Sequence, residues 1–309
     1  MFCSTAARPP RQQLARQFTT LLLLALSLLT PAYAGQGMAD GIFYQTFGEG
    51  QPVLIINGGP GLDSEGFATV AKAIAAEGYQ TILFDQRGTG RSPLPVIDAS
   101  TISMDLMVAD MEKLRQQLNI KQWTILGHSF GGMLAAHYAS KHPSHVSKLI
   151  FSSSGGLDLA FAEGFQQRLE QQLTAAERQT MAAYQLRQQA GDQTVNAALA
   201  DIRARAYVID DSKAPLVAAR LKVVDMQINQ LVMADLARQK FDHKQSFQQF
   251  RQPVLVLQGT NDIITVATAQ TIQRSFPNAR LEVMPQCAHY GWLDQPDQYY
   301  RAVFTFLKA

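Results

Sequence analysis

The 309 residues of this chain are 47% hydrophobic and 17% charged, with 27 basic and 25 acidic residues and a formal net charge of +2. Such a composition supports a sizeable buried core and excludes an intrinsically disordered chain. The near balance of charges gives no reason to expect nucleic acid or an anionic membrane as a partner.

The N-terminal segment, residues 1–34, has the pattern of a secretory signal peptide. Three arginines precede an apolar run at 21–29, and the sequence Pro-Ala-Tyr-Ala follows and ends at Ala34. A positive region, a short apolar region and a small-x-small ending predict cleavage after Ala34 and a periplasmic or secreted protein. The apolar run is short for a membrane span, although an uncleaved signal anchor is the alternative.

Cleavage would change both the charge and the cysteine content. It removes three arginines and no acid, which leaves 24 basic against 25 acidic residues and a net charge of −1. It also removes Cys3, so that Cys287 is the one cysteine left and no intramolecular disulfide can form. An exported domain of this size has a core large enough to fold without a disulfide, and no membrane contact is expected after cleavage.

Strands and helices alternate through the first half of the mature chain. After an edge strand at 42–47, continuous apolar runs predict buried strands at 52–56, 79–84, 123–126 and 146–151. Helices are predicted at 67–74, from a cap at Ser100 or Thr101 to 118, and at 130–140. This alternation predicts a mostly parallel central sheet with helices on both faces.

The alternation stops after residue 154. Residues 155–249 contain no convincing strand, but their apolar residues have helical spacing, notably at 165–173 and 216–236. The sheet then resumes with strands at 253–259 and 279–284 and helices at 266–275 and 296–307. Residues 35–154 and 250–309 are therefore predicted to form an α/β core, with residues 155–249 as an inserted helical cap.

One serine lies at the turn of a strand–turn–helix sequence, Ile125-Leu126-Gly127-His128-Ser129-Phe130-Gly131-Gly132. This is the G-x-S-x-G pattern, in which the glycines let the backbone pass close to itself and a strained turn holds the serine hydroxyl out. Asp262 and His289 each follow a later predicted strand. A nucleophilic serine needs a base, and the imidazole needs a carboxylate to fix its tautomer. The chain order and the strand-end positions therefore predict a catalytic triad of Ser129, Asp262 and His289.

Other acids and histidines are alternatives for these roles. Asp294 lies near His289 in the sequence, and Asp158 follows the strand that ends at residue 151. The remaining histidines are expected to be structural or solvated: His128, His137, His142, His145 and His243. The histidines show no paired spacing such as H-E-x-x-H, and no phosphate or dinucleotide fingerprint is present. No metal and no cofactor is therefore predicted.

The loop Asn57-Gly58-Gly59-Pro60-Gly61 follows the first buried strand and is predicted to complete an oxyanion hole. One donor is the N–H of Phe130, directly after the serine, and the other is that of Gly59, with Gly58 as the alternative. Glycine leaves such N–H groups open to a substrate oxygen because it has no side chain. A plain tight turn is the simpler interpretation of the loop.

A third run, Asp85-Gln86-Arg87-Gly88-Thr89-Gly90-Arg91-Ser92, completes a set of three motifs with the serine turn and the glycine loop. With them, the chain resembles the α/β-hydrolase superfamily, and within it the proline iminopeptidase-like group. The resemblance covers residues 42–154 and 250–308. It implies an α/β-hydrolase fold and a serine hydrolase that acts through an acyl-enzyme on a small-molecule or short-peptide substrate. It also implies that the third run is a structural loop, whose Asp and Arg pair with each other and with the backbone.

Two features depart from the pattern of that group. Asn57 stands where the group has a histidine, which changes the packing of the loop and makes Asn57 a candidate substrate contact. Aminopeptidases of the group hold the substrate's α-ammonium with acidic cap residues, because opposite charges attract strongly in a pocket of low dielectric. The candidates here belong to no recognisable motif: Glu163 and Asp225, and also Glu170, Glu177 and Asp235.

The predicted function is therefore an exported serine hydrolase, an aminopeptidase of the proline iminopeptidase type. A carboxylesterase or lactonase of the same fold is the alternative. An alternative of another class is a catalytically silent member that binds a ligand under its cap. The sequence does not determine the oligomeric state.

Overall fold

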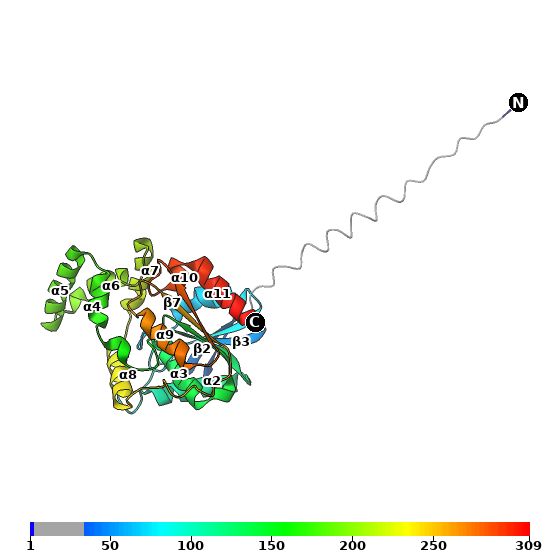
Figure 1. Cartoon of the computed structure of the whole chain (residues 1–309), viewed down its shortest axis with the longest axis horizontal. Helices are drawn as coiled ribbons and strands as arrows, with labels where there is room; N and C mark the ends of the chain where they lie inside the picture. The colour runs from blue at the N-terminus through cyan, green and yellow to red at the C-terminus, as the bar shows by residue number, and fades with distance from the viewer. Residues whose placement is uncertain (3–33) are drawn as a thin grey trace.

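The structure, a computed structural model, describes residues 1–2 and 34–309 (Figure 1). The predicted signal peptide lies outside the described residues except at its two ends. No helix in the described part of the chain is long and apolar enough to span a membrane.

One eight-stranded sheet forms the centre of the molecule, in the order β1-β2-β4-β3-β5-β6-β7-β8. The strands are β1 (Ala34–Ala39), β2 (Ile42–Phe47), β3 (Gln51–Ile56), β4 (Tyr79–Phe84), β5 (Trp123–His128), β6 (Val146–Ser152), β7 (Val254–Gly259) and β8 (Ala279–Met284). β2 is antiparallel to both of its neighbours, and every pair from β4 to β8 is parallel. The predicted α/β fold with a mostly parallel sheet is confirmed.

The edge of the sheet differs from the prediction. Residues 42–47 are not the edge strand, because β1 pairs with them in a hairpin. The sequence of β1, Ala-Gly-Gln-Gly-Met-Ala, has few of the residues that favour strands, so apolar patterning does not reveal it. Asp40 and Gly41 form the turn with φ values of 47° and 84°, the backbone that an Asp-Gly hairpin turn requires.

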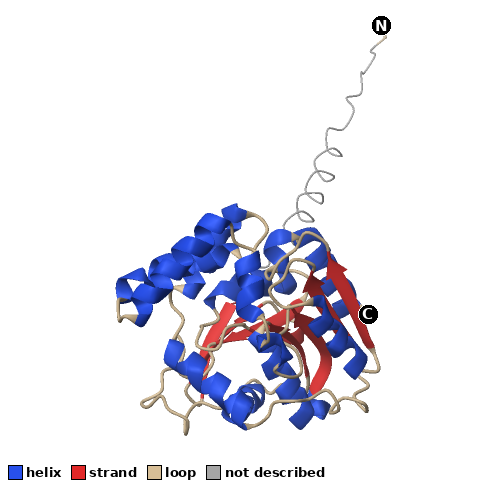
Figure 2. Ribbon diagram, turned by 60° about the vertical axis from the view of Figure 1, so that its left-hand side comes forward, coloured by secondary structure: helices blue, strands red, loops and turns tan. Residues whose placement is uncertain are grey.

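Helices cover both faces of the sheet (Figure 2). Alternate strand residues enter two separate hydrophobic clusters, as the two-residue period of a strand requires. One cluster contains side chains of α1 (Ala68–Ala75) and α11 (Pro296–Lys308). The other contains side chains of α2 (Met104–Gln117), α3 (Phe130–Lys141) and α9 (Val266–Ser275). A short helix, α10 (Gly291–Asp294), precedes α11.

The residue that caps α2 also differs from the prediction. Ser103 is the N-cap, and its Oγ accepts the N–H of Leu106 at 3.2 Å. Thr101 is instead part of the preceding turn, where its hydroxyl donates to the Val96 carbonyl at 2.9 Å. Three hydroxyl residues lie within four positions, and only the path of the incoming chain decides which one caps the helix.

Five α-helices lie between β6 and β7: α4 (Phe165–Gln171), α5 (Ala175–Gln189), α6 (Asn196–Arg205), α7 (Ala214–Leu221) and α8 (Met226–Arg238). Figure 1 shows α4, α5 and α6 to one side of the sheet. The span predicted as helical at 216–236 is two helices, because Asp225 caps the second one through a 3.0 Å bond from the Ile228 N–H. Apolar side chains of α7 enter one core cluster and those of α8 the other. The cap and the α/β core thus share their hydrophobic packing.

Candidate active site

Ser129 occupies the turn between β5 and α3 in a strained backbone conformation. Its φ is 54° and its ψ is −121°, values that cost a non-glycine residue free energy. Its N–H donates to the Ser152 carbonyl at 3.0 Å, and its own carbonyl accepts the N–H groups of Gly132 and Gly155 at 3.0 Å each. Three backbone hydrogen bonds therefore hold the turn in place.

The glycines of the turn are required by close backbone contacts. A Cβ on Gly127 would lie 2.4 Å from the Gly131 carbonyl oxygen, and a Cβ on Gly131 would lie 2.3 Å from that of Ile56. Both distances are far below van der Waals contact. The packing of α3 against β5 and β3 therefore explains the G-x-S-x-G spacing that the sequence shows.

His289 and Asp262 are hydrogen-bonded to each other. His289 Nδ1 lies 2.8 Å from Asp262 Oδ1, and both residues are buried. Asp262 also accepts the N–H of Ile264 at 2.9 Å and the side-chain amide of Gln258 at 2.8 Å. These donors fix the carboxylate, which in turn orients the imidazole and leaves Nε2 outside this bond.

The structure brings the three predicted residues to the same edge of the sheet. Ser129 follows β5, Asp262 follows β7 and His289 follows β8, each at the carboxyl end of its strand. The rings of His289 and His128 are 4.7 Å apart between centroids, and His128 directly precedes Ser129. Burial, followed by the nearby His289 and Arg220, lowers the pKa of His128 well below its ordinary value. His128 therefore packs beside the site as a neutral ring.

The two alternative acids have other partners. Asp294 accepts the N–H groups of Ala288 at 2.8 Å and Ile209 at 3.0 Å. Burial raises the pKa of Asp294, and these backbone donors oppose the rise. Asp158 accepts a hydrogen bond from Lys244. Of the three candidate acids, Asp262 is the one bonded to His289.

The glycine loop lies directly against Ser129. A Cβ on Gly58 would be only 2.7 Å from the Ser129 Cβ. Gly59 has a φ of 76° and lines the same cavity as Ser129 and Phe130, whereas Gly58 does not line it. Phe130 is the first residue of α3, so its N–H has no partner within the helix. These positions favour Phe130 and Gly59 over Gly58 as oxyanion donors.

Asn57 is a buried residue that supports this loop. It is fully buried, and its side-chain amide donates to the Leu62 carbonyl at 2.9 Å. Gln86 in turn donates to the Asn57 carbonyl at 3.1 Å. Asn57 does not line the cavity, so the prediction that it contacts substrate is not supported.

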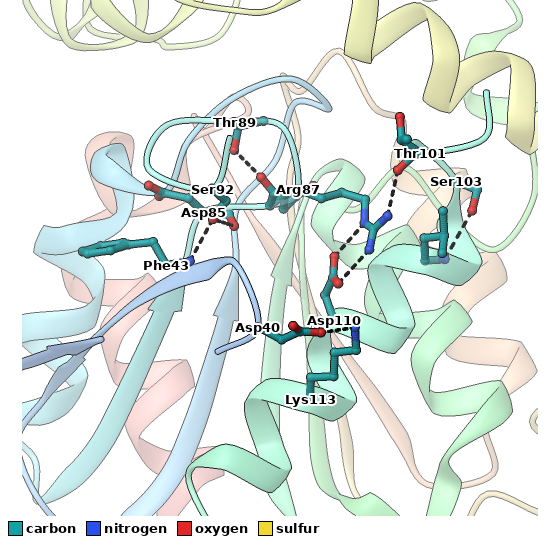
Figure 3. Close-up of polar contacts among 12 residues, drawn as sticks. Asp40, Phe43, Asp85, Arg87, Thr89, Ser92, Thr101, Ser103, Asp110 and Lys113 are labelled. Atoms are coloured by element: carbon teal, nitrogen blue, oxygen red, sulfur yellow. Dashed lines mark hydrogen bonds and ion pairs between the residues drawn. The ribbon is translucent and has the colours of Figure 1, made fainter. Parts of the chain in front are cut away.

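The run 85–92 is a structural loop that Gln86 joins to the glycine loop at Asn57, and Figure 3 shows its other polar contacts. Arg87 donates two hydrogen bonds of 2.7 Å to Asp110 of α2, and Ser92 accepts the N–H of Phe43 at 2.9 Å. Asp85 pairs with Arg91 at 2.9 Å. Burial raises the pKa of Asp85, but hydrogen bonds, chiefly from Arg91 and Ser64, outweigh burial and leave that pKa lowered. One of the two arginines therefore pairs within the loop, and the other ties the loop to α2.

A cavity of about 600 Å³ includes Ser129 in its wall, within the size range of small-ligand sites. Most of the wall is apolar, with side chains of α3, the loop after β6 and the cap helices. Two residues of the wall are charged, Arg203 and Lys222, and both are basic. No Asp or Glu of the described chain lines it.

The cap acids proposed for an α-ammonium group lie elsewhere. The Asp225 carboxylate caps α8, and Glu163 is exposed. Glu177 forms a capping box with Thr174, and Glu170 accepts a side-chain amide at 2.8 Å. Asp235 accepts the N–H of Met104 at 2.9 Å. The prediction that Glu163 or Asp225 binds substrate is not supported, because helix capping and solvent exposure account for their positions.

Tyr207 and Arg203 enter the site without any motif that marks them in the sequence. Tyr207 lies edge-on to the His289 ring, with centroids 5.3 Å apart. The Tyr207 backbone carbonyl accepts the backbone N–H of His289 at 3.1 Å. Arg203 lies on α6 and lines the cavity. Their basic and aromatic character within the cap was the one signal available, and many cap residues share it.

One group of potential metal ligands is found in the described part of the chain, away from the cavity. Ligand atoms of Glu112, His142 and His145 lie within 4.8 Å of one another. The Glu112 carboxylate already accepts Arg115 at 2.9 and 3.0 Å, and also Tyr138 and His145. Burial raises the pKa of Glu112, but these hydrogen bonds lower it to about 2. A metal would have to displace the arginine, and the group is better explained as a structural ion-pair network.

Known proteins with similar sequences or structures include hydrolases of several kinds. A family model described as alpha/beta hydrolase fold matches residues 51–296. A proline iminopeptidase from Lactobacillus delbrueckii subsp. bulgaricus is 27% identical over 270 residues, 83% of this chain and 89% of that protein. The solved proline iminopeptidase of Mycobacterium smegmatis has a TM-score of 0.69 and 23% identity, and covers 89% of this chain and 98% of its own. An esterase from Exiguobacterium antarcticum has a TM-score of 0.70 and 20% identity, and covers 90% and 100%.

Proposed function

Because the chain belongs to the α/β-hydrolase fold family, we propose that it is a serine hydrolase that cleaves acyl bonds with Ser129, His289 and Asp262. The observation that carries the proposal is the 2.8 Å bond between His289 and Asp262, beside a strained turn that presents Ser129 to a cavity. A serine hydroxyl is a weak nucleophile at neutral pH, and a base oriented by a carboxylate is the arrangement that activates it.

The reaction follows from these positions. His289 Nε2 accepts the proton of the Ser129 hydroxyl as the oxygen attacks the substrate carbonyl. The N–H groups of Phe130 and Gly59 stabilise the negative charge that develops on the carbonyl oxygen. His289 then donates its proton to the leaving group, and water releases the acyl group by the same steps. Asp262 keeps the imidazole in the required tautomer throughout.

A fluorophosphonate probe tests the nucleophile. We expect the wild-type protein to be labelled covalently and Ser129→Ala to lose all labelling. Ser140→Ala, on the helix that follows, is the matched control and should be labelled like the wild type, since the Ser140 hydroxyl only donates to the His137 carbonyl. A folded wild-type protein that stays unlabelled would overturn the proposal and favour the ligand-binding alternative.

The cleaved bond is proposed to be a carboxylic ester. The names of the similar sequences favour an aminopeptidase, which is the second candidate. An aminopeptidase must hold a free ammonium group, and the absence of any described carboxylate from the cavity wall opposes this. Rates on prolyl and other aminoacyl-arylamides, compared with short 4-nitrophenyl esters, decide between them. Faster turnover of the aminoacyl substrates would contradict the proposal that the cleaved bond is an ester.

Export is proposed from the signal sequence at 1–34. Expression of the full chain in a Gram-negative host and N-terminal sequencing of the periplasmic product should give Gly35 as the first residue. Full-length protein in the cytoplasm would contradict export.

A further inference from the structure

Arg203 is a half-buried cation in the cavity wall that pairs with no acid of the described chain. The other basic residue of the cavity wall, Lys222, pairs with Asp201 at 2.6 Å, and Arg205 of the same helix pairs with Glu177 and Asp211. Arg203 forms no ion pair with any residue that the structure describes, although it lines the cavity. Its charge is therefore available to a ligand.

The surroundings of Arg203 favour an anion. The cavity wall is mostly apolar and contains no described Asp or Glu, so the guanidinium has lost part of its water without gaining a protein counter-charge. A guanidinium presents a planar fork of donors that matches a carboxylate with two parallel hydrogen bonds. A substrate ammonium would instead meet the positive charge of Arg203, which no carboxylate of the described chain neutralises.

The position of Arg203 relates the anion to the reacting atoms. Arg203 and Tyr207 line the same cavity as Ser129. Tyr207 packs against the ring of His289 at 5.3 Å. The cavity that Arg203 lines therefore also includes Ser129 and the aromatic residue that packs against the catalytic histidine.

We propose that Arg203 binds a carboxylate at the far end of the substrate's acyl chain, so that the substrates are monoesters of dicarboxylic acids. This inference rests on the proposed serine hydrolase function and names its substrate class. The carboxylate supplies the counter-charge that the cavity lacks, and the apolar wall covers the chain between the carboxylate and the ester carbonyl.

Three esters of equal chain length test the charge preference: 4-nitrophenyl hydrogen adipate, 4-nitrophenyl hexanoate and 4-nitrophenyl 6-aminohexanoate. We expect kcat/KM to be about ten-fold or more higher for the anionic ester than for the neutral one, mainly through KM. The cationic ester should be the poorest. A fourth ester, with a neutral acyl chain and a carboxylate on the phenol, shows whether the anion belongs to the leaving group. Equal rates on the first two esters, or a preference for the fourth, would overturn the proposal.

Variants assign the preference to Arg203. Arg203→Gln should abolish the preference for the anionic over the neutral ester, and Arg203→Lys should keep part of it. Arg205→Gln, two residues along the same helix, is the matched control and should keep the wild-type ratio, because Arg205 does not line the cavity. Circular dichroism establishes that each variant is folded. An unchanged ratio in a folded Arg203→Gln would overturn the role of Arg203.

Binding separates failure of this inference from failure of the proposed function. If no ester is hydrolysed and the probe does not label Ser129, the hydrolase proposal fails, but the anion site can still be measured. Calorimetry with monomethyl adipate and with methyl hexanoate on Ser129→Ala should then show tighter binding of the acid by about ten-fold or more. This difference in affinity should disappear in the double variant that carries both Ser129→Ala and Arg203→Gln. Equal binding of both molecules would reject the anion site.

Discussion

Two carboxylates contact the histidine loop, and they act on different parts of it. Asp262 bonds to the His289 ring, whereas Asp294 bonds to the backbone N–H of Ala288 and to that of Ile209 in the cap. A carboxylate that holds the ring controls the tautomer and the charge that forms on it, and one that holds the backbone controls only the loop.

Asn substitutions should separate these roles. Asp262→Asn should lower kcat by about 10⁴-fold, since an amide favours the wrong imidazole tautomer. Asp294→Asn keeps an acceptor for the backbone, so its kcat should change less than ten-fold, with a small loss of stability of about 1 kcal/mol. Steady-state rates on a neutral ester and urea unfolding measure both. Equal losses of kcat would mean that the orienting acid has been misassigned.

Among the secondary-structure elements, the cap is tied to the core at several points rather than resting on it. The backbone N–H of His289 donates to the Tyr207 carbonyl, and Arg220 of α7 donates to the Tyr290 hydroxyl at 3.0 Å. Farther along, Asp235 of α8 accepts the N–H of Met104 in the first turn of α2 at 2.9 Å. The last bond satisfies a helix N-terminal donor that is buried and has no partner in its own helix.

Removal of that acceptor should destabilise the protein measurably. Asp235→Ala leaves the buried Met104 N–H without a partner, and we expect the free energy of unfolding to fall by about 1–3 kcal/mol. Asp201→Ala is the control, because its bond to Lys222 is an exposed ion pair worth about 1 kcal/mol or less. Urea midpoints measure both variants. Similar midpoints for the two variants would show that the bond between Asp235 and the Met104 N–H stabilises the protein no more than the exposed ion pair does.

At the scale of the whole molecule, one buried and one half-buried histidine make stability depend on pH. His137 of α3 and His243, near the end of the cap, are hydrogen-bonded at 2.9 Å. Burial, followed by the charge of His137, lowers the pKa of His243 to about 4 from an ordinary value of 6.5. Burial also lowers the pKa of His137, and the hydrogen bond that its ring donates to Asp105 opposes this.

Stability should therefore fall on acidification. Between pH 6.5 and about 4 the unfolded chain binds a proton at His243 that the folded protein does not, so the folded state loses its advantage as the pH decreases through this range. Glu112, with its pKa lowered to about 2, extends the loss below pH 4.5. We expect a lower urea midpoint at pH 4.5 than at pH 7. In His243→Gln the midpoints at these two pH values should differ less than in the wild type. An unchanged difference in that variant would exclude His243 as a source.

The sequence by itself determined the features that depend on neighbouring residues or on strand order. The run around Ser129 predicts a strained turn because its glycines and serine are contiguous, and the alternation of apolar runs predicts the parallel sheet. In a parallel sheet the carboxyl ends of the strands meet at one edge, so chain order alone could place Asp262 and His289 near Ser129.

Tertiary structure decided what depends on the packing of one element against another. Glu163 and Asp225 carry the charge expected of ammonium-binding residues, yet one is exposed and the other caps α8. Arg203 belongs to no motif, yet it lies in the cavity wall. The physical reason is that a cap helix can present any of its faces to the active site. The rotation of that helix is set by apolar contacts distant in the chain, and local spacing does not encode it.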